Sequence, residues 1–76
     1  MAVTERGVRT RERLVLAAAA VVQTHGLAAT TTRTIAAEAG VSEATIYRHF
    51  PDKSALIFAA LLERDHPAFA WIEALP

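Results

Sequence analysis

Residues 31–50, TTRTIAAEAGVSEATIYRHF, contain two short helical patterns on either side of Gly40. Apolar residues recur at helical spacing in both patterns: Ile35, Ala36 and Ala39 in the first, Val41, Ile46 and Phe50 in the second. Gly40 suits the left-handed residue that ends a helix, because it has no Cβ to clash. Ser42 stands where its hydroxyl can accept from the free N–H groups of the second helix. The stretch therefore predicts a helix-turn-helix, in which two helices cross closely at a tight turn.

A longer helix is expected before this motif, over about residues 10–25. An apolar stripe at helical spacing predicts it, and Gly26 closes it: the stripe is Leu14, Ala17, Ala18, Val21 and Val22. Leu16 falls on the outer side of this helix, where no partner is predicted for it. We expect Thr32 to be the N-cap of the helix that follows.

A fourth helix is expected after Pro51, with Asp52 as its N-cap and a span of about residues 53–65. A short helical segment should follow over residues 68–75. The predicted fold class is all-α, with a three-helix, homeodomain-like helix-turn-helix core, a fourth helix and a short helical tail. The predicted division is a flexible basic arm over residues 1–9, a helix-turn-helix domain over 10–66 and an apolar tail over 67–76.

Composition agrees with one small domain and excludes several kinds of site. The 76 residues carry eight basic and eight acidic side chains, but residues 1–53 have a net charge of plus two and the rest minus two. There is no cysteine, and His25, His49 and His66 are too far apart for a local metal motif, so no metal or cofactor is expected. The longest apolar runs are too short to span a bilayer. These features predict a cytoplasmic protein that is not an enzyme.

The motifs between residues 31 and 56 closely resemble the DNA-binding domain of the TetR-type transcriptional regulators. They are Thr31-Thr32, Ile35-Ala36, Gly40-Val41-Ser42, Ile46-Tyr47-Arg48-His49-Phe50, and Lys53 followed by Leu56. The resemblance extends upstream over residues 14–26. It implies a sequence-specific DNA-binding regulator, expected to be a repressor that binds a palindromic operator through the second helix of the motif in the major groove.

The resemblance also assigns roles to residues of this chain. It directs Tyr47, Lys53, Thr32 and His49 to DNA phosphates, whereas Arg33 can reach a base edge or a phosphate. Ala44 and Thr45 lie at the end of the recognition helix that enters the major groove, and Arg48 can touch base or phosphate. For Glu43, base contact and interaction with the helix N-terminus are equally open. The complete predicted DNA-binding set is Thr32, Arg33, Ser42, Glu43, Ala44, Thr45, Tyr47, Arg48, His49 and Lys53.

The fourth predicted helix is apolar almost all round, although only one stripe of it can pack on the core. We therefore expect a homodimer through this helix and the apolar tail, which would let two motifs read a palindrome. TetR-type proteins continue into a larger ligand-binding helical domain, and this chain is expected to lack it. The alternative function is a helical protein-interaction module that keeps the fold without binding DNA, for which the zero net charge is the main support.

Overall fold

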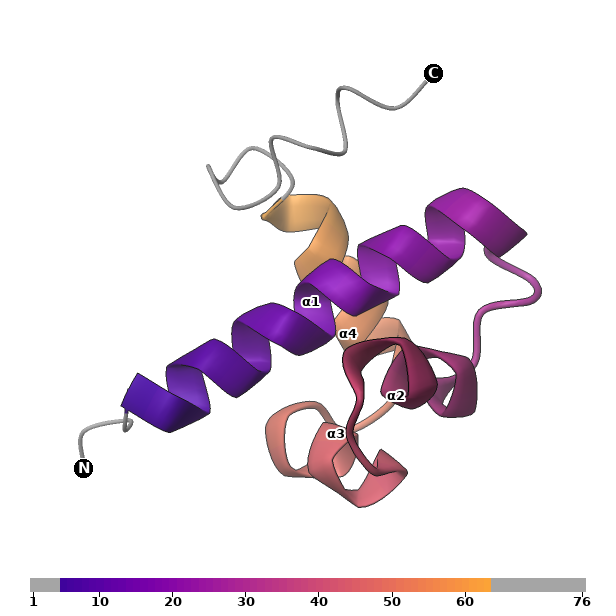
Figure 1. Ribbon diagram of the computed structural model, residues 1–76. Helices are drawn as coiled ribbons and strands as arrows, with labels where there is room; N and C mark the ends of the chain where they lie inside the picture. The colour runs from indigo at the N-terminus through magenta and orange to yellow at the C-terminus, as the bar shows by residue number, and fades with distance from the viewer. Residues whose placement is uncertain (1–4, 64–76) are drawn as a thin grey trace.

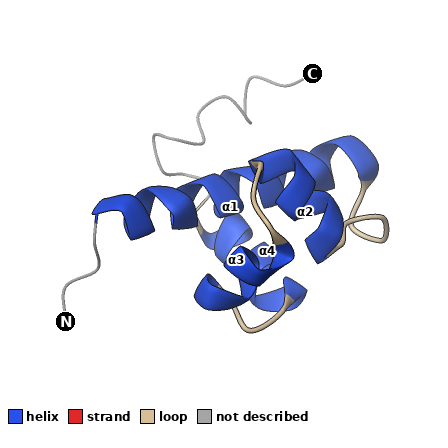
Figure 2. Cartoon of the chain, turned by 60° about the horizontal axis from the view of Figure 1, so that its bottom comes forward, coloured by secondary structure: helices blue, strands red, loops and turns tan. Residues whose placement is uncertain are grey.

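The computed structural model describes residues 5–63, and these residues form four α-helices and no strand (Figure 1). The helices are α1 (Glu5–His25), α2 (Thr32–Ala39), α3 (Glu43–His49) and α4 (Lys53–Leu62). The long helix α1 packs against both α2 and α4, and α2 packs against α3 (Figure 2). The predicted all-α fold is confirmed, while the tail expected over residues 68–75 lies outside the described residues.

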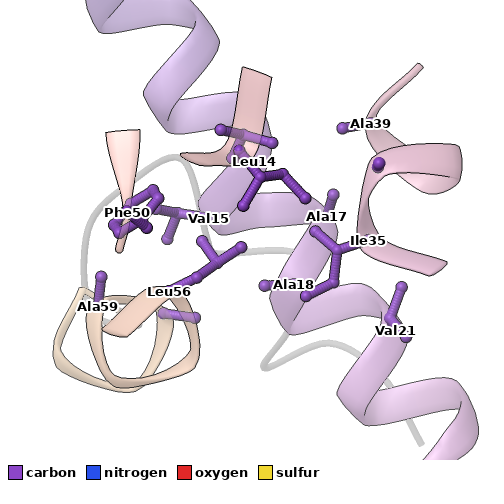
Figure 3. Packing of buried hydrophobic residues seen from close by; sticks show 13 residues of the cluster. Leu14, Val15, Ala17, Ala18, Val21, Ile35, Ala39, Phe50, Leu56 and Ala59 are labelled. Atoms are coloured by element: carbon purple, nitrogen blue, oxygen red, sulfur yellow. The ribbon is translucent and has the colours of Figure 1, made fainter. Parts of the chain in front are cut away.

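The buried core gathers side chains from all four helices and from Phe50 between α3 and α4. Its largest fully buried apolar side chains are Leu14, Val15, Ile35, Ile46 and Leu56. Figure 3 shows Val15 on the side of α1 that faces Phe50 and Leu56, while Ala17 lies toward Ile35 and Ala39. Since α1 is covered on two sides, its buried stripe is wider than the sequence predicted.

Three residues of α1 therefore differ from their predicted places. Val15 was not included in the stripe but is buried, and Val22 was included but is only half-buried. Leu16, expected to lie unmatched on the outer side, is partly buried against the core. The sequence predicted one narrow stripe, whereas α2 and α4 together cover a broader arc of the helix.

Helix α1 begins five residues earlier than expected, so residues 5–9 of the predicted flexible arm are helical. Gly7 and the lack of a periodic apolar face before it were the reasons to begin the predicted helix at residue 10. A single glycine costs only about 1 kcal/mol in a helix, however, and extending a nucleated helix adds one hydrogen bond for each residue fixed. The extension places Arg9 and Arg13 one turn apart on the same helix.

The turn between α2 and α3 has the predicted glycine geometry. Gly40 lies in the left-handed region with φ 73°, and its N–H donates to the carbonyl of Ala37 at 3.3 Å. The N–H of Val41 donates to the carbonyl of Ala36 at 3.0 Å. These two bonds satisfy carbonyls at the end of α2, so that the chain can turn at once into α3.

Thr31, not Thr32, is the N-cap of α2. Thr31 Oγ1 accepts from the N–H of Thr34 at 3.1 Å, and Thr34 Oγ1 accepts from the N–H of Thr31 at 2.9 Å. This reciprocal pair needs a hydroxyl three residues after the cap. Thr31 has one in Thr34, whereas the residue three after Thr32 is the buried Ile35. The prediction for Thr32 was therefore wrong, and its hydroxyl is left available for other contacts.

Helix α4 has the predicted cap and ends a little earlier than expected. Asp52 Oδ1 accepts from the N–H of Ala55 at 2.8 Å. The last helical residue is Leu62, and Glu63 follows as the C-cap. Leu56, Ile57, Ala59 and Ala60 are buried, while Phe58, Leu61 and Leu62 are 62%, 59% and 67% exposed. One side of α4 is thus unpaired within the described part of the chain. None of the helices described is long and apolar enough to cross a membrane.

Candidate nucleic-acid interface

The exposed face of α3 carries the side chains predicted to read bases. Glu43 and Ala44 are exposed and Thr45 is half-buried, while Ile46 points into the core and anchors the helix. Ser42 is the N-cap, as predicted: its Oγ accepts from the N–H of Thr45 at 3.3 Å and lies 3.1 Å from Thr45 Oγ1. The start of α3 is therefore held in place by its own cap, with its polar side chains outward.

The N-terminal ends of α2 and α3 meet through a small group of polar side chains. Thr32 Oγ1 donates to Glu43 Oε2 at 2.9 Å, and the Tyr47 hydroxyl lies 3.5 Å from Thr32 Oγ1. Tyr47 is 53% exposed, and its hydroxyl lies beside the start of α2. The three residues were predicted separately as site residues, and the structure places them in one group.

Two further predicted contact residues, Arg33 and Lys53, lie outside this group. Arg33 is exposed in the first turn of α2 and makes no hydrogen bond or ion pair within the described residues. Lys53 is the first residue of α4, and only three residues separate it from the end of α3. Its ammonium group and the N-terminal end of α4 are suited to an anion, because both are positive. The flexible Arg33 and Lys53 side chains are thus not brought into contact with the central group.

A basic hollow extends the interface onto α1. It has a volume of about 700 Å³ and lies between the N-terminal half of α1 and the exposed side of α3. Both helices contribute positive or protonatable side chains: the basic lining residues are Arg9, Arg13, Arg48 and His49. Among the side chains that the structure describes, no acidic one lines the hollow. Thr45 also lines it, so the hollow is continuous with the exposed polar face of α3.

Arg13 has a second task in this region. Its Nη2 donates to the carbonyl oxygen of Ala39 at 2.7 Å, at the C-terminal end of α2. A positive charge there is favoured by the helix dipole, and the bond ties α1 to the turn of the motif. The predicted DNA-binding set did not include Arg13, and Arg9 was placed only in a flexible basic arm because the helix was expected to begin at residue 10. Their spacing of four residues would have indicated a shared helix face.

This arrangement is that of a helix-turn-helix DNA-binding domain: a short anchored helix with an outward polar face, bounded by basic groups on neighbouring helices. The family model described as bacterial regulatory proteins, tetR family, matches residues 14–60. The chain therefore belongs to the TetR family of DNA-binding transcriptional regulators. It is 47% identical over 53 residues to the nucleoid occlusion factor SlmA of Idiomarina loihiensis. That match covers 70% of this chain and 26% of the relative, so the chain spans about a quarter of its length. No solved structure matches the chain.

Proposed function

We propose that the chain binds a palindromic operator as a repressor, with α3 in the major groove. The observation that carries this proposal is the exposed polar face of α3, which adjoins the hollow that basic side chains of α1 and α3 line. Base contacts fall to Arg33, Ala44 and Thr45, since these side chains are short or flexible and stand at the start of α2 or α3. Repression would follow from occupying the operator and excluding polymerase.

Phosphate contacts position the motif on the duplex. We assign these contacts to Thr32, Tyr47, Arg48, His49 and Lys53, to which the hollow adds Arg9. Ser42 supports the reading helix as its cap. Groups that bind phosphate raise the affinity for every duplex and carry no sequence information. We also place the protein in the cytoplasm, with the DNA, and assign it a binding role rather than a catalytic one.

A homodimer through α4 would let two copies read the two halves of a palindrome. The exposed Phe58, Leu61 and Leu62 support this interface, as does the groove that Leu27, Ile57, Phe58 and Leu61 line beside them. The apolar tail included in this prediction lies outside the described residues. Sedimentation over a range of concentrations would show a monomer–dimer equilibrium, and a monomer at every concentration would contradict the dimer.

The rival function, a protein-interaction module without DNA binding, draws on the same exposed face of α4. The rival does not explain why basic side chains gather around α3 in a chain of zero net charge. A titration separates DNA binding from the rival function. A mixed-sequence duplex is added to the ¹⁵N-labelled chain, and the amide chemical shifts are followed. DNA binding predicts shifts at Arg33, Thr45 and Lys53. Shifts confined to the Phe58 side of α4, or none, would contradict it.

A further inference from the structure

A hydrogen bond between the side chains of Thr32 and Glu43 joins α2 to α3. The bond is 2.9 Å long, and Tyr47, one turn further along α3, brings its hydroxyl to 3.5 Å from the same Thr32 oxygen. A threonine hydroxyl has a single hydrogen to donate. In the free protein, Glu43 accepts that hydrogen.

We propose that Glu43 is an internal competitor of DNA phosphate for the hydroxyl of Thr32. The inference rests on the proposed DNA-binding function, which directs Thr32 and Tyr47 to the phosphate backbone. A phosphate oxygen that accepts from Thr32 must displace the Glu43 carboxylate, since the hydroxyl cannot donate to both. The two anionic groups also repel each other at this short range. Binding of DNA therefore carries a penalty that Glu43 imposes.

This penalty is independent of sequence, because every duplex presents the same phosphates. Glu43 then weakens binding to operator and to unrelated DNA alike, and base preference is left to other residues of the motif. If Glu43 instead accepts from cytosine N4, the change in affinity has the opposite sign. Removal of its charge would then weaken binding, and would do so at the operator alone.

The variant Glu43→Gln separates the two roles, because it keeps the size of the side chain and one acceptor oxygen but removes the charge. We expect the full chain to bind a selected site and an unrelated duplex about two- to fivefold more tightly, as for the loss of one exposed charge interaction. The gain should shrink as salt rises. Glu38→Gln is the matched control: Glu38 is exposed on α2 and lies beside α1, and its loss should change affinity far less.

Thr32→Val tests whether the effect passes through the hydroxyl. In this background the gain in affinity from Glu43→Gln should be clearly smaller than in the unaltered chain, since only the repulsion between carboxylate and phosphate is left. A full gain in the Thr32→Val background would replace competition with plain charge repulsion and overturn the proposal. Unchanged binding of Glu43→Gln would also overturn it, as would a loss confined to the selected site with a new preferred base.

Helical circular dichroism and thermal melting of each variant would identify any loss of fold. Different results would contradict the proposed DNA-binding function and the competition by Glu43. If the unaltered chain binds no duplex at any salt concentration, the proposed DNA-binding function is wrong and the inference falls with it. If the unaltered chain binds duplexes and Glu43→Gln does not tighten that binding, the inference alone is wrong.

Discussion

At the scale of single residues, Arg33 is the side chain on which the recognition of a DNA sequence depends most, if it contacts a base and not a phosphate. It is exposed at the start of α2 and makes no hydrogen bond or ion pair within the described residues, so its guanidinium is available for a guanine edge. Arg33→Ala should cost about 1–3 kcal/mol on the selected site and relax the preference at one base position. Competition binding against single-base variants of the site measures this.

Tyr47→Phe is the comparison for Arg33→Ala. It removes one hydroxyl that is assigned to phosphate, so it should weaken binding to all duplexes by a similar factor and leave base preference unchanged. If Arg33→Ala behaves in the same uniform way, Arg33 is a phosphate contact and the base-reading assignment is wrong.

At the scale of elements, the turn between α2 and α3 depends on Gly40. Its φ of 73° is costly for any residue with a Cβ, although space is not the difficulty: an added Cβ would lie 3.5 Å from Arg13 Nη2, an ordinary contact. Gly40→Ala should therefore lower the free energy of unfolding by about 1–2 kcal/mol through backbone strain. Urea unfolding measures this. Gly40→Asn should cost less, and equal stability of the alanine variant would contradict the turn geometry.

The basic hollow beside the N-terminal half of α1 is predicted to bind DNA phosphate. Arg9 lines this hollow beside Arg48 and His49, next to the reading face of α3. Arg9→Ala should weaken binding to every duplex and reduce the slope of log affinity against log salt by about one. A titration repeated at several salt concentrations gives the slope. An unchanged slope would remove Arg9 from the interface.

The helix-turn-helix could be predicted from sequence because its signals are local. Gly40, Ser42 and Asp52 each act within one helical turn, and the structure confirms all three. The choice between Thr31 and Thr32 needed the reciprocal bond to Thr34, which a run of threonines conceals. The hollow and the Thr32–Glu43 bond join different helices, so periodicity within one helix could not indicate them.

At the scale of the whole molecule, Arg11 connects the two ends of the fold. Its Nη1 and Nη2 each donate to a carboxylate oxygen of Glu63 at 2.9 Å, and its Cζ lies 5.3 Å from the centroid of the Phe50 ring. The side chain thus joins α1 to the end of α4 and to the residue between α3 and α4. These interactions of Arg11 help to hold α1 against the rest of the fold.

Arg11→Met should lower the free energy of unfolding by about 1 kcal/mol or less, because the Arg11 and Glu63 side chains are 42% and 34% exposed and solvent screens the pair. The hydrogen bond to Glu63 raises the pKa of Arg11 above its ordinary value. The arginine's contribution is therefore fully present below the ordinary arginine pKa and is lost only as pH rises through the raised value. Urea unfolding of Arg11→Met at pH 6 and pH 9 should show the same loss, and a loss that differs between them would contradict this.

The central claim, that α3 reads DNA sequence, is tested most directly by in vitro selection of the full chain from a pool of random duplexes. We expect one enriched site with related half-sites, bound more weakly as salt rises. The account would be contradicted if repeated rounds enriched no sequence and the chain showed no salt-dependent binding to any duplex.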